Sequence, residues 1–245
     1  MTAMPAFHDS NSARLDFAFR SGAIGAIGAD PAPPPWKATA DPLARIGRSL
    51  VLEKDQGLFR EADIADRVFS VSSGMVRIHK LLPDGRRQII GFLQSGDFLG
   101  LSIDATYLYS AETVTACALI QYHRHQLQAV IDSDPGVQRR LYAIAAHELI
   151  LAQEQMLLLG RKTAIEKLCS FLLRLARRQR RPGTEVTTIP MPMGRADIAD
   201  YLGLTVETVC RSLTRLKTTG VIRLCENNRI ECLDMARLAA LAQSA

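Results

Sequence analysis

Residues 195–217 carry the sequence RADIADYLGLTVETVCRSLTRLK, and this stretch decides the fold of the C-terminal third. Apolar Ile198 and Leu202 recur at helical spacing and stop at Gly203. A glycine at that point takes the positive φ of a sharp turn without a Cβ clash. Ala199, four residues before Gly203, is small enough to let two helices cross closely. The stretch therefore predicts one helix, a tight turn and a second helix.

The second predicted helix starts after Thr205, whose side chain can cap its N-terminus. Val209, Leu213 and Leu216 recur every three or four residues, so they line one face that turns toward a core. The other face is polar. Such a pair of helices is typical of a helix-turn-helix, in which the second helix enters the major groove of DNA.

A hairpin follows the two helices. Residues 221–225 and 229–233 are apolar at alternate positions and flank Glu226-Asn227-Asn228, a turn signal. This order of helix, turn, helix and β-hairpin predicts a winged helix.

Charge supports a polyanion as the partner of this region. The chain has a net charge of +5, with 15 basic and 17 acidic residues up to Gly160 but 15 basic and 8 acidic residues after it. A nearly neutral part up to Gly160 and a basic C-terminal part suit a sensor or scaffold joined to a DNA-binding module, although a solvated basic surface gives the same count.

The exposed face of the second helix supplies the side chains expected to meet double-stranded DNA. The predicted base contacts are Glu207, Cys210 and Arg211, and the predicted phosphate contacts are Thr205, Thr208, Ser212, Thr214, Arg215 and Lys217.

The chain before this module divides into three parts. Residues 1–40 are rich in Ala, Gly, Ser and Pro and predict a flexible tail. In residues 41–134 short apolar runs alternate with turns such as Pro83-Asp84-Gly85 and Ser95-Gly96-Asp97, which indicates antiparallel hairpins in a sandwich or barrel. Asp134-Pro135 then starts a long helix, predicted over 135–161.

An uncharged stripe runs along the predicted long helix at intervals of three and four residues. Its members are Tyr142, Ala145, Leu149, Ala152, Met156 and Leu159. This is the spacing of a coiled-coil seam, although a helix that buries one face in its own core gives a similar pattern. A two-fold partner is what a reader of palindromic DNA needs, so we expect a homodimer seam.

Several classes of protein are not indicated. No apolar run approaches the roughly 20 residues that cross a bilayer and no secretion signal opens the chain, so we expect a soluble cytoplasmic protein without a membrane partner. Five widely spaced cysteines without a CxxC pair predict neither disulfides nor a metal site. We find no nucleophile with a base and no phosphate loop, and therefore expect no enzyme and no cofactor.

The segment Tyr201–Val209, followed by Arg211, resembles the recognition region of the CRP/FNR family, in particular its FNR and FixK branch. Residues 88–92 and 96–101 are similar to the β-roll of that family, so the resemblance extends over roughly residues 43 to 243. It implies an α+β fold with an N-terminal antiparallel β-roll like that of cyclic-nucleotide-binding domains, a dimerisation helix and a C-terminal winged helix-turn-helix over 162–245.

The resemblance also implies a function. Glu207 and Arg211 carry over as readers of a TTGA half-site and its inverted repeat, in a TTGA-N6-TCAA palindrome. Arginine can donate two hydrogen bonds to guanine, and glutamate can accept from an exposed base amino group. The chain then resembles a FixK-type activator that recruits RNA polymerase to genes of low-oxygen metabolism or nitrogen fixation.

Three departures bear on regulation. The first 116 residues hold no cysteine, so the iron-sulfur cluster of FNR is not expected, and the lone Cys117 is expected to be buried. Leu101 and Tyr109-Ser110-Ala111 stand where cyclic-AMP-binding members have a Glu and an Arg-Ser-Ala that clamps the phosphate. Oxygen-switched members of the family have a charge in the dimer seam that keeps the two chains apart, whereas this chain has the uncharged Ala152 there. We therefore expect a dimer that is active without an effector. The alternative is a regulator whose β-roll binds a small molecule.

Cys210 precedes Arg211 on the predicted DNA-reading face. It is either a small, tolerated contact residue or a redox brake. A thiol there is expected to be oxidisable, and a sulfinate would bring negative charge toward DNA phosphates.

Overall fold

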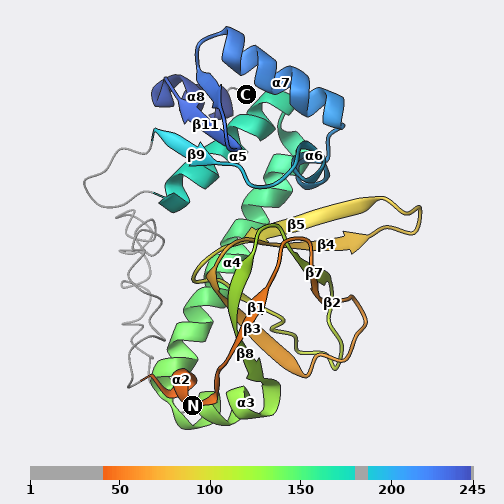
Figure 1. Cartoon of the computed structure of the whole chain (residues 1–245), viewed down its shortest axis with the longest axis vertical. Coiled ribbons are helices and arrows are strands. Elements are labelled where there is room, and N and C mark those ends of the chain that lie inside the picture. The colour runs from red at the N-terminus through yellow and green to blue at the C-terminus, as the bar shows by residue number, and fades with distance from the viewer. Residues whose placement is uncertain (1–40, 180–186, 244–245) are drawn as a thin grey trace, which may run out of the picture.

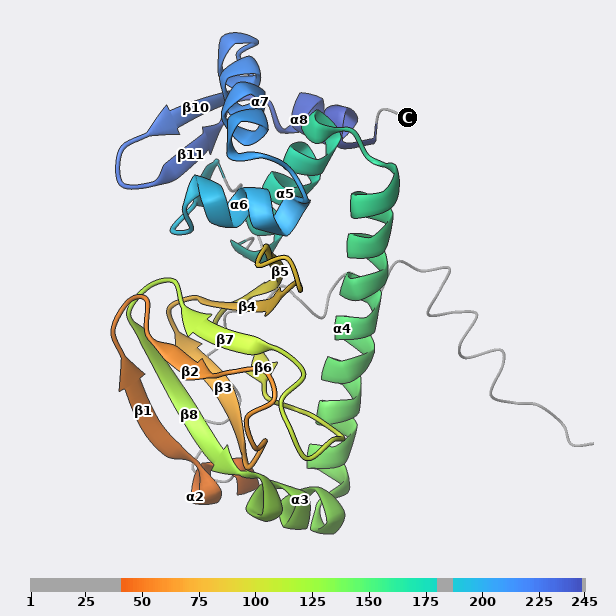
Figure 2. The same ribbon diagram turned by 90° about the vertical axis from the view of Figure 1, so that its right-hand side faces the viewer.

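The computed structural model describes residues 41–179 and 187–243, and the predicted N-terminal tail lies outside these ranges. A long helix runs along the molecule, with a β-roll beside one half and the C-terminal helices around its other end (Figures 1 and 2). The α+β fold class expected from the sequence is confirmed.

The β-roll consists of two four-stranded antiparallel sheets, ordered β1-β8-β3-β6 and β2-β7-β4-β5. Its strands are β1 (Arg48–Leu52), β2 (Gly57–Phe59), β3 (Arg67–Ser73), β4 (Val76–Leu81), β5 (Arg87–Leu93), β6 (Phe98–Leu99), β7 (Ser110–Thr113) and β8 (Cys117–His123). The turn between β4 and β5 contains Gly85 at φ +83°, as its Pro-Asp-Gly sequence requires. Val71, Val76 and Leu119 are fully buried between the sheets.

Two helices close the end of the β-roll that lies at the bottom of Figures 1 and 2, where only strands and turns were expected. These are α2 (Pro42–Ile46) and α3 (Arg124–Ser133). In α3, Leu127, Val130 and Ile131 lie three and four residues apart and pack on one core cluster. That spacing is helical, and it explains the difference.

The long helix α4 (Pro135–Arg161) starts as its sequence predicts. The carboxylate of Asp134 accepts hydrogen bonds from the amides of Gly136 at 2.7 Å and Val137 at 3.2 Å. This N-cap and the proline at the first position explain why the helix begins here.

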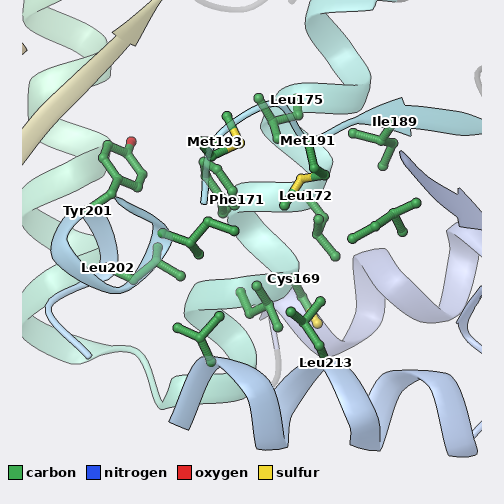
Figure 3. Close-up of a cluster of buried hydrophobic side chains, with 14 of the residues drawn as sticks. Cys169, Phe171, Leu172, Leu175, Ile189, Met191, Met193, Tyr201, Leu202 and Leu213 are labelled. Carbon is green, nitrogen blue, oxygen red and sulfur yellow. The ribbon is translucent and has the colours of Figure 1, made fainter. Parts of the chain in front are cut away.

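The C-terminal domain packs around α5. Its elements are α5 (Ala164–Gln179), β9 (Thr188–Pro190), α6 (Arg195–Leu202), α7 (Val206–Thr218), β10 (Ile222–Cys225), β11 (Arg229–Cys232) and α8 (Met235–Gln243). Cys169 and Leu172 of α5 are fully buried between α7, α8 and the three-stranded sheet β10-β11-β9 (Figure 3). The same hydrophobic cluster includes Ile89 and Phe92 of the β-roll, so the two domains share a core.

Candidate nucleic-acid interface

Helices α6 and α7 form the helix-turn-helix. Gly203 ends α6 in the left-handed conformation, at φ 60° and ψ 46°, and its amide donates to the carbonyl of Ala199. The side-chain oxygen of Thr205 then accepts from the amide of Thr208 at 3.1 Å and so caps α7. The turn at Gly203 and the cap at Thr205 thus fix where α7 begins relative to α6.

The outer face of α7 presents Glu207, Cys210 and Arg211 to solvent. A distance of 3.7 Å separates Nη1 of Arg211 from Oε1 of Glu207, and these side chains are 70% and 76% exposed. An exposed pair of this kind contributes little to stability. Both side chains are therefore free to turn toward base edges.

The structure separates the predicted phosphate contacts. Thr205, Thr214, Arg215 and Lys217 are exposed and Thr208 is half-buried. Ser212 is only 8% exposed, so its assignment as a phosphate contact is corrected. The reason is its position, since residues 209, 212, 213 and 216 share the inward stripe of α7.

The wing adds basic residues that the sequence analysis did not single out. Asn227 and Asn228 take positive φ values of 58° and 53° in the turn between β10 and β11, and Arg229 is exposed beside them. Arg223 on the other strand is also exposed and pairs with Glu231 at 2.7 Å. The sequence did offer a signal for them, because Arg223 and Arg229 are basic residues on the predicted hairpin.

Most of the predicted dimer stripe on α4 is uncovered. Tyr142, Leu149 and Met156 are 76%, 60% and 65% exposed, and Ala145 and Ala152 are exposed as well. A different stripe, containing Val137, Leu151 and Leu158, faces the protein's own core. The first five residues are therefore open to a partner.

Leu159 departs from the rest of that stripe and is half-buried against the core of the C-terminal domain. Its Cδ2 lies 3.4 Å from the place where a Cβ on Gly203 would stand. The end of α4 thus packs beside the turn between α6 and α7, and the assignment of the half-buried Leu159 to the dimer seam stays a prediction.

Tyr109 occupies the region of the β-roll expected to hold a nucleotide phosphate in relatives. The amide of Gly100 donates to the Tyr109 hydroxyl at 3.0 Å. The ring of Phe59 lies 5.8 Å from that of Tyr109 and 3.7 Å from that of Tyr107. Burial raises the pKa of Tyr109, so its hydroxyl stays neutral near pH 7.

The five cysteines fall into two groups. Cys210 and Cys225 are exposed. Cys117, Cys169 and Cys232 are buried, and burial raises the pKa of each of these thiols, that of Cys169 to about 11. The buried thiols are therefore poor nucleophiles at neutral pH.

Within residues 41–179 and 187–243, no group of three or more His, Cys, Asp or Glu side chains is arranged to hold a metal ion. Over the same ranges, none of the helices combines the length and apolar character that crossing a bilayer requires.

Comparison with known proteins places the two domains. Residues 49–134 match the cyclic nucleotide-binding domain family, and residues 166–241 match the Crp-like helix-turn-helix domain family. The chain is 41% identical to the nitrogen fixation regulation protein FixK of Bradyrhizobium diazoefficiens, over 80% of this chain and 83% of that protein. It is 37% identical to the transcriptional activator protein FnrL of Cereibacter sphaeroides, over 75% of each.

Solved structures agree with these matches. The structure of FixK2 from Bradyrhizobium japonicum superposes with a TM-score of 0.76 at 38% identity, covering 82% of this chain and 99% of that one. A CooA mutant from Carboxydothermus hydrogenoformans shares the fold at a TM-score of 0.69 and 18% identity, covering 83% of this chain and 91% of that one. The matched relatives are named as regulators rather than enzymes. The chain therefore belongs to the CRP/FNR family of transcription regulators, on its FixK branch.

Proposed function

We propose that this protein is a dimeric transcription activator that reads a TTGA-N6-TCAA palindrome through Glu207 and Arg211. The observation that carries the proposal is the exposed pair Glu207 and Arg211 on the outer face of α7, in a chain 41% identical to FixK. Arginine donates to guanine O6 and N7 and glutamate accepts from a base amino group, which gives each half-site a donor and an acceptor reader.

Exposed Thr205, Thr214, Arg215 and Lys217 surround this pair and serve the phosphate backbone. Because helix N-termini also favour phosphate, the start of α7 contributes to the same contacts.

Dimerisation through α4 brings two helix-turn-helix units to one DNA molecule. Its support is the exposed stripe of Tyr142, Ala145, Leu149, Ala152 and Met156, which carries no charge that would repel a second copy.

The genes under control are proposed to serve nitrogen fixation or low-oxygen metabolism, and RNA polymerase is the proposed partner. The similarity to FixK, a nitrogen fixation regulation protein, supports the first part. The name of FnrL, a transcriptional activator, supports activation.

We further propose that DNA binding needs neither a cluster nor a cyclic nucleotide. The Tyr109 hydroxyl already satisfies the Gly100 amide, and no guanidinium stands in Tyr109-Ser110-Ala111 to hold a phosphate. An anionic ligand would have to displace the half-buried Tyr109 side chain without gaining a charged partner.

A second candidate is a regulator whose β-roll binds a small molecule. A cavity of about 330 Å³ favours it, and this cavity is lined by Phe59 and Tyr107 together with residues of β1 and β3. Its lining combines apolar side chains with the polar groups of Asp63, Asp66, Arg67 and Gln121.

Fluorescence anisotropy on a labelled TTGA-N6-TCAA duplex, with purified and ligand-free protein, separates the two candidates. Tight binding that far exceeds binding to scrambled DNA is expected. Binding that arises only after a cell metabolite extract is added would support the second candidate, and equal binding to both duplexes would contradict palindrome recognition.

Oxidation of Cys210 is proposed to inhibit binding. Hydrogen peroxide oxidises a thiolate to a sulfenate with release of water, and a second peroxide yields the sulfinate. Because Cys225 is also exposed, Cys210→Ala and Cys225→Ser are compared after peroxide treatment. Protection of DNA binding in Cys210→Ala alone is expected, and equal loss in the parent and in Cys210→Ala would contradict the brake.

A further inference from the structure

An ion cluster joins the β-roll to the first helix of the helix-turn-helix. Each carboxylate oxygen of Asp197 in α6 accepts from a different arginine of the β-roll: Oδ2 from Nη1 of Arg77 at 3.2 Å, and Oδ1 from Nη2 of Arg87 at 2.6 Å. Nε of Arg87 also donates to Oδ2 of Asp200 at 2.8 Å. We name Arg77, Arg87, Asp197 and Asp200 the interdomain clamp.

The clamp is supported from both sides. Behind it, Glu112 of β7 accepts from Nη2 of Arg77 at 2.8 Å and holds that guanidinium in place. Beside it, Nε2 of Gln88 donates to the carbonyl of Asp200 at 2.6 Å. Strands β4 and β5 thus bind α6 at Asp197 in its first turn, and β5 binds it again at Asp200 one turn later.

Burial makes the clamp sensitive to geometry. The side chains of Arg77 and Asp197 are each only 11% exposed. A buried ion pair adds little net stability, because removing both charges from water costs about as much as their attraction returns. A packing of α6 on β5 that kept Asp197 buried without its arginines would, however, be strongly disfavoured. The clamp therefore discriminates between orientations of α6.

Tyr201 connects the same helix to β5 and α5 through its ring, and to α4 through hydrogen bonds. The ring of Tyr201 lies 5.3 Å from the rings of both Phe92 and Phe171. Its hydroxyl donates to Oε1 of Gln155 at 2.6 Å, while Nε2 of Gln155 donates to the Tyr201 carbonyl at 3.0 Å. The helix that carries the open apolar stripe is thus in direct contact with α6.

Helix α7 moves together with α6, because the connection between them is short and they share a hydrophobic core. Gly203 and Leu204 both donate to the carbonyl of Ala199, which makes the connection short. Leu202 of α6 and Val209 of α7 are fully buried in one hydrophobic cluster. Any rotation of α6 on the β-roll would swing α7 by the same angle.

We propose that Arg87 is a positioning residue for DNA recognition: through Asp197 and Asp200 it sets the orientation of α7, and hence the spacer length that the dimer accepts. The inference rests on the proposed palindrome binding. Each added base pair moves a half-site by about 3.4 Å along the DNA and rotates it around the axis. A dimer whose two recognition helices are held rigidly therefore accepts one spacer length, whereas a dimer whose recognition helices can reorient accepts several.

The test uses the full-length protein and five duplexes: TTGA and TCAA separated by six, seven or eight base pairs, a single TTGA half-site, and a scrambled sequence. Anisotropy gives the Kd for each duplex. We expect the parent protein to prefer the six-base-pair spacer over the others by about tenfold. Arg87→Gln should lower that preference to about twofold, mainly through weaker binding to the six-base-pair duplex, and leave half-site binding unchanged.

Matched variants separate positioning from general damage. Arg86→Gln is the control, because Arg86 lies in the same hairpin, is 76% exposed and pairs with Asp84 of that hairpin. It should keep the parent's spacer preference. Arg87→Lys retains one positive charge beside both aspartates and should restore most of that preference. Should Arg87→Gln fail to fold, Asp200→Asn removes one contact of the clamp and is expected to lower the preference partly.

Three outcomes would overturn the inference. An unchanged spacer preference in a folded Arg87→Gln variant would overturn it while leaving the proposed function intact. Equal losses on the half-site and on all spacers would mean that Arg87 only supports the fold. A parent protein without preference for the palindrome over scrambled DNA would instead overturn the proposed function, and the clamp's proposed role would fall with it.

Discussion

Arg77 and Asp197 lie 120 residues apart in the sequence, and their side chains form an ion pair of 3.2 Å that is almost closed to solvent. One belongs to the β-roll and the other to the first helix of the DNA-reading module. Next to them Met75, Ile89 and Phe92 join the hydrophobic cluster built around α5. The surface between the domains is thus packed like a protein interior, and it gives the reading helix a defined direction.

Replacing Arg211 by alanine should cost about 1–3 kcal/mol of binding free energy on the TTGA-N6-TCAA duplex and relax the preference for the contacted guanine. The reason is the loss of a bidentate donor. Anisotropy on the palindrome, on duplexes changed at that guanine and on random DNA measures both effects.

Arg215→Ala is the matched control for this change, because an exposed phosphate contact should weaken binding about equally on all sequences. If Arg211→Ala behaved in the same uniform way, Arg211 would not be a base reader.

Replacing Gly203 by alanine should destabilise the protein by about 1–2 kcal/mol. Gly203 has a left-handed backbone, which costs a residue with a Cβ about that much. A Cβ there would also meet Leu159 at 3.4 Å. Denaturant unfolding measures the change. Gly194→Ala is the control, since Gly194 has a negative φ and open space around it, and an equal effect of both substitutions would contradict the turn argument.

Replacing Leu149 by glutamate should prevent the proposed dimer from forming without unfolding the chain. Leu149 is exposed in the single chain, so a carboxylate there disturbs only a partner's surface. Light scattering coupled to size exclusion gives the mass, and anisotropy should show at least about tenfold weaker palindrome binding. At 100° per residue, the exposed Ala143 lies on the far side of α4 from the stripe. Ala143→Glu should remain dimeric, and a dimeric Leu149→Glu variant would place the interface elsewhere.

His79 should make stability fall as the solution becomes more acidic. Burial lowers its pKa below 6.5 and nearby Arg87 and Arg77 lower it further, while Glu112 and Asp197 act in the opposite direction. The unfolded chain then binds a proton at a higher pH than the folded chain. Stability is therefore retained above pH 6.5 and is lost as the pH falls through 6.5 toward the folded value.

Unfolding by guanidinium chloride at pH 7.5 and 5.5 tests this, with His79→Gln as the comparison. The variant should lose less stability between these two pH values than the parent does. An equal loss in both proteins would show that His79 does not contribute.

Local chemistry accounts for what the sequence predicted well. Asp134 and Pro135 start α4, Gly203 turns the chain between two helices, and Asn227-Asn228 closes the wing. Each is a case in which the backbone geometry needs a particular residue type within a few positions. Such signals are visible in any stretch of sequence that contains them.

What the sequence did not predict depends on packing between distant segments. Ser212 is polar by type but shares the inward stripe of α7, and Leu159 continues an exposed stripe only until the C-terminal domain covers it. Arg77, Arg87 and Asp197 look like ordinary surface charges in their own elements. Their pairing exists only because α6 lies over β5, which no local pattern encodes.

The Tyr109 hydroxyl, which accepts a hydrogen bond from the Gly100 amide, belongs to the chain itself. A free ligand shifts a protein between states according to its concentration. The Tyr109 hydroxyl that binds the Gly100 amide is part of the chain, so its concentration cannot vary independently. If the protein acts as proposed, the amount of the chain itself is the remaining variable, and a dimer makes that variable steep. While monomers predominate, the dimer concentration rises with the square of the chain concentration, so a threefold increase in synthesis gives about a ninefold increase in the DNA-reading form. Under the proposed function, the rates at which the chain is made and removed would therefore set the amount of the DNA-reading dimer.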